Sequence, residues 1–177
     1  DDYVTKLVNY LYANVSQNRI IYVEYSNEVW NTFFDQGKYA TAKAVELKLT
    51  NYHKFYAMRS LQIFNTFSSV FGNNSTRLKF VISYQAVSKW VADQILSYST
   101  LATLPNLIIA AAPYYDCNNI GSAANTAIVA TQTVAQLLQT CTNQSSTLTG
   151  ILQIETNVSV TYGNLPMAVY EAGTSIS

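Results

Sequence analysis

One stretch decides the fold: Ile20-Ile21-Tyr22-Val23-Glu24-Tyr25, a β-branched and aromatic run typical of a buried strand. Three similar runs follow, at 78–84, 107–111 and 167–170. Helical patterns surround them: an amphipathic opening segment with Val4, Leu7, Val8 and Leu11, then stretches at about 33–71, 88–98, 122–138 and 146–161. The stretch at 33–71 is long enough for two helices or one bent helix. This alternation predicts an α/β fold of parallel strands joined by right-handed crossovers.

Four strand–helix units suit two architectures, an open doubly wound sheet or half of an eightfold barrel. Near-continuous apolar strands fit a sheet that is covered on both faces. Periodicity does not choose between the two. No glycine-rich phosphate loop follows any strand, which disfavours nucleotide binding.

The composition narrows the class of ligand. Of 177 residues, 49% are hydrophobic and only 11% are charged, and 14 are Tyr. A typical soluble domain has about 25% charged residues, so uncharged polar groups must cover this surface. Ten basic and ten acidic residues cancel and no basic run occurs, so no nucleic-acid partner is expected. No apolar run reaches the roughly 18 residues of a membrane span. The balance suits neutral ligands such as sugars, and equally a glycosylated structural protein.

Several features favour a secreted history. Asn-x-Ser/Thr acceptor triplets occur five times, at Asn14, Asn73, Asn74, Asn143 and Asn157. Cys117 and Cys141 are the only cysteines, and in a secreted protein they form either one disulfide or two buried thiols. Two Cys and one distant His do not match a zinc site, so neither metal nor cofactor is expected. The opening residues do not resemble a signal peptide, and we expect residues 1–177 to be one segment of a larger or processed protein.

Polar and aromatic residues gather where the predicted strands end. The first strand ends in Ser26-Asn27-Glu28-Val29-Trp30-Asn31 and the fourth in Tyr170-Glu171-Ala172-Gly173. Gln85 follows the second strand, and Tyr114 follows the third. Ligands of parallel α/β folds bind at these carboxyl ends. Two carboxylates there match the needs of glycosidic cleavage, in which one acid protonates the leaving oxygen and the other attacks or stabilises the anomeric carbon.

The run Tyr25-Ser26-Asn27-Glu28-Val29-Trp30-Asn31 resembles the Asn-Glu acid/base motif that ends the fourth strand of clan A glycoside hydrolases. Within that clan it is similar to secreted cellulase-like proteins. Residues 112–115 are similar to the end of the sixth strand of these proteins, and residues 167–173 to their seventh-strand nucleophile motif. Order and spacing agree along nearly the whole chain. The resemblance implies a (β/α)8 barrel of which this chain contains strands four to seven, the rest coming from the parent protein or another chain.

The resemblance also implies roles in a retaining mechanism on a polysaccharide or other glycan. Glu28 would be the general acid/base and Glu171 the nucleophile. Asn27 would bind the sugar 2-hydroxyl, and Tyr114 would lie beside Glu171. One departure is Ala172, where the related motif usually has Gly.

Plainer interpretations of these residues remain open. Glu28 is also suited to a helix start, and Glu171 to a surface loop. Trp30 fits packing under the next helix as well as stacking on a sugar, and Gln85 and Trp90 are more modest candidates for the cleft. Glu24 is expected to pair with a buried partner such as Lys79. His53, among aromatic residues, is expected in the core or at its rim. The alternative function is a catalytically inactive structural or carbohydrate-binding domain of an extracellular glycoprotein; an esterase lacks its Gly-x-Ser-x-Gly elbow here.

Overall fold

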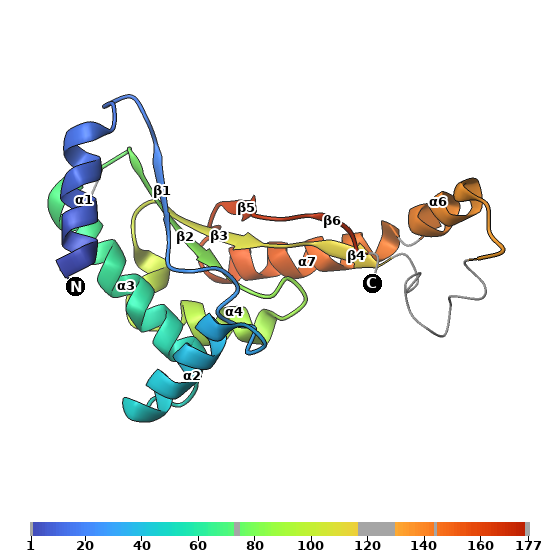
Figure 1. Ribbon diagram of the computed structural model, residues 1–177, viewed down its shortest axis with the longest axis horizontal. Coiled ribbons are helices and arrows are strands. Elements are labelled where there is room, and N and C mark those ends of the chain that lie inside the picture. The colour runs from blue at the N-terminus through green and yellow to red at the C-terminus, as the bar shows by residue number, and fades with distance from the viewer. Residues whose placement is uncertain (1, 73–74, 117–129, 144, 176–177) are drawn as a thin grey trace.

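The computed structural model describes residues 2–72, 75–116, 130–143 and 145–175 as an α/β fold (Figure 1). Its elements, in chain order, are α1 (Asp2–Asn14), β1 (Ile21–Glu24), α2 (Asp35–Glu46), α3 (Tyr52–Phe71), β2 (Leu78–Ser83), α4 (Lys89–Leu96), a 3-10 turn (Leu101–Thr103), β3 (Leu107–Ala111), β4 (Tyr114–Asp116), α6 (Val134–Asn143), α7 (Ser145–Thr161), β5 (Met167–Val169) and β6 (Gly173–Ser175).

The predicted parallel sheet is confirmed. Strands β1, β2, β3 and β5 pair in that order and every pair is parallel. All four predicted strands are present within a residue or two of their expected bounds. The long helical stretch divides into α2 and α3, because Asn51 caps α3 by accepting a hydrogen bond from the Lys54 N–H at 3.1 Å. Within the described residues, no helix is both long and apolar enough to cross a membrane.

The core lies on one face of the sheet. Alternate strand residues face it, namely Val23, Leu78, Phe80, Ile82, Leu107 and Ile109, all of them buried. From the helix layer, Phe64 stacks on Phe80 with ring centroids 4.7 Å apart. On the opposite face, Tyr22 is 63% exposed and the neighbouring Glu24 is also exposed. Helices therefore cover one face of β1 and β2. On the other face, β1 carries the exposed side chains of Tyr22 and Glu24.

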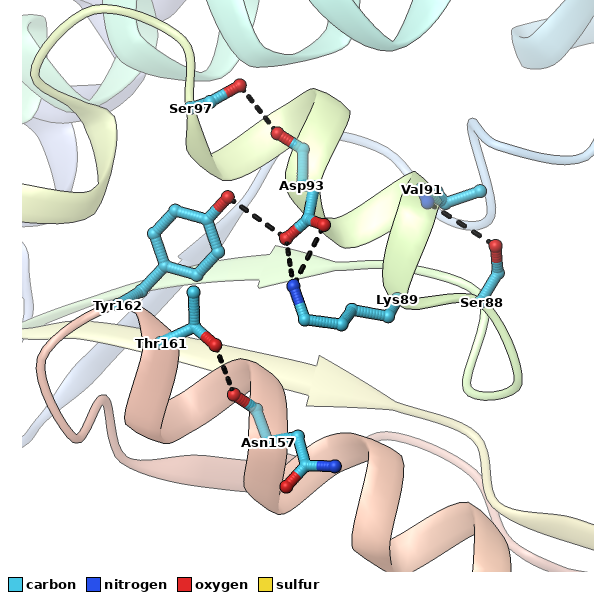
Figure 2. A network of polar contacts seen from close by, with 8 residues as sticks. All are labelled: Ser88, Lys89, Val91, Asp93, Ser97, Asn157, Thr161 and Tyr162. Atoms are coloured by element: carbon cyan, nitrogen blue, oxygen red, sulfur yellow. Dashed lines mark hydrogen bonds and ion pairs between the residues drawn. The ribbon is translucent and has the colours of Figure 1, made fainter.

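The covering helices are neighbours in the order of the strands, with α1 against α3, α3 against α4, and α4 against α7. Figure 2 shows how α4 is fixed to α7. The Asp93 carboxylate accepts from Lys89 at 2.7 Å and from the Tyr162 hydroxyl at 3.1 Å. The Ser88 hydroxyl caps the start of α4 by accepting from the Val91 N–H at 3.3 Å.

A one-residue bulge lies between two paired regions of the chain: β3 with β5, and β4 with β6, which directly follow them. Upstream, Ala111 pairs with Val169, and downstream Tyr114 pairs with Gly173. Two residues, 112–113, thus lie opposite three, 170–172. A bulge of this kind bends the strand and redirects the side chains in it. Glu171 is the middle residue of the three.

The last helical region differs from expectation. Two helices are present as predicted, but the gap between them is narrower than the expected 139–145, since α6 continues to Asn143 and α7 begins at Ser145. The first part of the helix predicted at 122–138 lies outside the described residues, and the described helix begins at Val134.

Candidate functional site

The carboxyl ends of all four strands line one pocket of about 190 Å³, named the Glu28 pocket below. Its wall consists of Glu28, Trp30, Gln85, Ala86, Val87, Ala112, Tyr114, Ile151 and Tyr170. Three of the four predicted ligand-binding residues, Trp30, Gln85 and Tyr114, are therefore brought together with Glu28. The mixture of aromatic, apolar and few polar groups is typical of small-ligand sites.

Residues from the two outer strands meet in this pocket. Neighbouring strands lie about 4.8 Å apart, so the ends of β1 and β5 would be about 14 Å apart in a flat sheet. Yet the Trp30 side chain, in the loop after β1, lies near enough to the Tyr170 hydroxyl to lower the pKa of Tyr170. The loop after β1 therefore carries Trp30 across the strand ends to the residue that follows the other outer strand.

The pKa of Tyr170 responds to the charges around its hydroxyl. Burial raises the pKa of Tyr170 far above its usual range, and the charge of Glu28 raises it further. The carboxylates of Glu24 and Glu171 act in the same direction. Charges interact strongly only within about 10 Å at physiological salt. Three carboxylates from opposite edges of the sheet thus raise the pKa of one phenol.

Tyr114 connects the two predicted catalytic carboxylates. The interaction of its hydroxyl with the Glu171 carboxylate, together with burial and the charges of Glu171 and Glu28, raises the pKa of Tyr114 to about 12. The phenol therefore stays protonated throughout the physiological range and donates to Glu171. Tyr114 thus lies close to both carboxylates.

The loop that carries Glu28 has an unusual backbone. Ser26 and Glu28 both adopt left-handed conformations, with φ of 60° and 46°. Such residues are costly by about 1–3 kcal/mol and gather at functional sites. A turn in which the Asn31 N–H donates to the Glu28 carbonyl at 2.9 Å closes the loop. Beneath it, Gly37 of α2 leaves no room for a side chain, since a Cβ there would lie 2.9 Å from the Thr32 Cα.

Glu171 and Asn27 lie at the margin of the site. Glu171 is exposed and does not line the Glu28 pocket, although it bonds to Tyr114 in the pocket wall. Asn27, predicted to bind sugar, is also exposed and outside the lining, while its carbonyl accepts from Gln36 at 2.7 Å. Ala172 is exposed beside Glu171 in the bulge.

The prediction that Glu24 pairs with Lys79 is wrong. Its carboxylate accepts from the Ser83 hydroxyl at 2.6 Å, whereas Lys79 donates to Asn106 at 3.2 Å. Burial raises the pKa of Glu24, and the bond from Ser83 opposes that shift. Glu24 pairs with Val81, which lies midway between Lys79 and Ser83, so register alone does not choose between them; the Glu24 side chain contacts Ser83, on the carboxyl-end side.

Tyr170 is a pocket residue that the sequence interpretation did not single out. The available signal was its place directly before Glu171, on the same side of the strand as Ala168. Its hydroxyl and the Trp30 indole nitrogen are both buried, and neither makes a hydrogen bond of good geometry within the described part of the chain.

The remaining predicted sites stay predictions. The candidate glycan acceptors Asn14, Asn143 and Asn157 are exposed, and Asn73 and Asn74 lie outside the described residues. Cys117 also lies outside them, so its pairing with Cys141 is untested. Among the side chains that the structure describes, no group of three or more His, Cys, Asp or Glu is arranged to hold a metal ion.

Comparison with protein-family models, with curated proteins and with solved structures gives no match to this chain. What the site does must therefore be argued from its geometry.

Proposed function

We propose that this chain forms the catalytic part of a secreted, retaining glycoside hydrolase that acts on β-linked glycans, with Glu28 as general acid/base and Glu171 as nucleophile. One observation carries the proposal: Glu28 and Glu171, from opposite edges of the sheet, both act on the Tyr114 phenol at the rim of one pocket. Paired carboxylates flanking a small-ligand pocket are the arrangement that glycosidic cleavage requires.

Parallel strands in sequential order support a barrel as the complete fold. Half of a (β/α)8 barrel has its helices on one face and its future interior on the other. Each outer strand borders an apolar groove: one of about 400 Å³ between β1 and α1, lined by Val4, Leu7 and Leu11, and one of about 270 Å³ beside β5, lined by Leu152, Met167 and Val169. In the proposed barrel, the remaining strand–helix units, from the parent protein or another chain, cover these grooves and pair with the open strand edges.

The proposed mechanism uses two steps. The Glu28 carboxylic acid donates its proton to the glycosidic oxygen while the Glu171 carboxylate attacks the anomeric carbon, which breaks the glycosidic bond and forms a glycosyl ester on Glu171. The Glu28 carboxylate then takes a proton from water, whose oxygen attacks the anomeric carbon and releases Glu171. The Tyr114 hydroxyl donates a hydrogen bond to Glu171 and thereby orients it. Asn27 would turn toward the sugar 2-hydroxyl when substrate is bound.

An inactive carbohydrate-binding or structural domain is the second candidate. The exposure of Glu171, its place outside the pocket lining and the adjacent Ala172 favour it. In such a domain the Glu28 pocket would bind a glycan without cleaving it, and removal of either carboxylate would leave no catalytic deficit to measure.

Carboxamide variants distinguish the two candidates. In the full-length secreted protein, Glu28→Gln and Glu171→Gln should each lower the hydrolysis of an aryl β-glycoside by at least about a thousandfold and leave thermal unfolding unchanged. Glu46→Gln is the matched control. Glu46 is an exposed acid at the end of α2, pairs with Lys43 and belongs to neither motif. Wild-type turnover by either active-site variant would contradict the proposal.

A further inference from the structure

Trp90 is an exposed aromatic residue close to the Glu28 pocket. It lies in the first turn of α4, and its side chain is 58% exposed. The segment just before α4 supplies Gln85, Ala86 and Val87 to the pocket wall. Trp90 therefore lies beside the pocket on the carboxyl-end side of the sheet.

A series of contacts connects Trp90 with the pocket wall. The His53 ring contacts Trp90 edge-on, with centroids 5.4 Å apart and planes at 82°. His53 in turn packs on Tyr52 at 4.0 Å, and the Tyr52 hydroxyl donates to the Trp30 carbonyl at 2.9 Å. Trp30 lines the Glu28 pocket, so this series of contacts connects Trp90 with the backbone of a pocket residue.

The support beneath Trp90 is uncharged. His53 is only 3% exposed, and burial lowers its pKa to about 4. At neutral pH the imidazole is therefore neutral. Trp90 thus rests on a neutral ring rather than on a charged group that would draw water to the contact.

The helix that carries Trp90 is rigidly held. Figure 2 shows Ser88 capping its start and Asp93 bonded to both Lys89 and Tyr162. Its inner side is buried through Val91, Ala92, Ile95 and Leu96. A side chain on a fixed element loses little freedom when a ligand binds, which favours affinity.

The place of Trp90 in the strand order limits what can contact its exposed side chain. It follows β2, an inner strand, whereas the apolar grooves that await further strand–helix units border the outer strands β1 and β5. Completion of a barrel at the outer strands leaves this inner position open. The occupant must then be a ligand with an apolar face and polar edges. A pyranose ring has both, through its C–H face and its equatorial hydroxyls, and it stacks on flat aromatic surfaces.

We propose that Trp90 is the stacking surface of a second sugar-binding subsite next to the Glu28 pocket, so that the ligand is a chain of several β-linked sugars rather than a single terminal sugar. The inference rests on the proposed function for its class of ligand. It adds a residue and a chain-length requirement that the two carboxylates do not imply.

The test is the dependence of affinity on chain length. Binding of β-1,4-linked gluco-, xylo- and manno-oligosaccharides of one to six units is measured by calorimetry on full-length protein that carries Glu171→Gln. For the sugar that binds, Trp90→Ala should weaken binding of tetramers and longer chains about tenfold and leave the monosaccharide within about twofold. Trp90→Phe should retain most of the affinity, because the flat ring remains. Tyr10→Ala is the control, since Tyr10 is 64% exposed on the distant helix α1.

Equal affinity of Trp90→Ala and the Tyr10→Ala control for every chain length would overturn the subsite, as would the absence of binding across the panel. Hydrolysis of an aryl β-glycoside, measured in parallel without Glu171→Gln, separates this result from the proposed catalysis. Length-dependent binding without hydrolysis would reject the catalytic proposal and keep the subsite. Hydrolysis with no effect of Trp90→Ala on longer chains would do the reverse.

Discussion

The Tyr114 hydroxyl on β4 interacts with the Glu171 carboxylate in the bulge that follows β5, and this interaction raises the pKa of Tyr114. The two residues are diagonal neighbours rather than a direct pair, because Tyr114 pairs with Gly173, two residues after Glu171. Glu171 is exposed, so in the proposed mechanism Tyr114 is the side chain that orients its carboxylate. Removal of the Tyr114 hydroxyl should therefore affect chemistry more than folding.

Tyr114→Phe should lower kcat about tenfold to a hundredfold, since a hydrogen bond to a charged group contributes about 1.5–3 kcal/mol. The pKa of Tyr114 is raised to about 12, so the phenol is a donor at every practical pH. The deficit should therefore be the same from pH 5 to pH 9. Steady-state kinetics on an aryl β-glycoside measure it. A deficit that vanishes at one end of this range would show that Tyr114 acts through its own titration instead.

The contact between Gly37 and the Glu28 loop gives a second prediction. A Cβ at Gly37 would collide with the Asn31 carbonyl group, with its carbon at 2.8 Å. Gly37→Ala should displace the loop that holds Glu28, reduce kcat/KM at least tenfold and destabilise the protein by about 1–3 kcal/mol.

Gly150→Ala is its matched control, because Gly150 lies inside α7 with no atom within 4 Å of the added Cβ. This variant should keep full activity and gain up to about 1 kcal/mol from helix propensity. Thermal unfolding and kinetics of both variants make the comparison. Wild-type kcat/KM in Gly37→Ala would mean that the loop does not depend on this contact.

The buried acid Glu155 predicts a pH dependence of stability. Glu155 on α7 is 7% exposed and accepts a hydrogen bond from the buried Tyr84 hydroxyl. Burial raises its pKa from 4.5 to about 7, and the bond from Tyr84 opposes part of that shift. The folded state therefore binds the proton more tightly than the unfolded state. Its stabilising contribution is complete below pH 4.5 and is lost as the pH rises through about 7.

Urea unfolding of the wild type should therefore show a loss of up to about 3 kcal/mol between pH 4.5 and pH 8 that comes from this residue. Glu155→Gln has no charge to bury, so its stability should decline less over the same interval. The difference between the two proteins isolates Glu155 from other titrating groups. Parallel curves for both would show that burial of Glu155 has no such effect.

Much of this fold was predictable because its strands are short, apolar and separated by strong helical patterns. The run at 107–111 has the predicted bounds, and the helical stretch at 33–71 is divided by a capping Asn51. The strand ends were predictable for the same reason, since parallel strands all present their carboxyl ends to one edge.

Register and bulges were not predictable from the same patterns. Glu24 and Lys79 share a face of the sheet, but pairing sets Glu24 opposite Val81 and within reach of Ser83. The extra residue among 170–172 leaves no mark in hydrophobic periodicity, yet it determines where Glu171 lies. The approach of Trp30 to Tyr170 brings together residues that follow the two outer strands, 140 positions apart, which no local stretch encodes.

The most direct measurement of the central claim is covalent labelling of the proposed nucleophile, Glu171. The full-length protein is incubated with 2-deoxy-2-fluoro β-glycosides that carry a good leaving group, and its proteolytic peptides are analysed by mass spectrometry. We expect time-dependent inactivation and a single fluoroglycosyl ester on Glu171, absent from Glu171→Gln and formed more slowly in Tyr114→Phe. Hydrolysis of the parent glycoside with no adduct, or an adduct on another carboxylate, would contradict the assignment.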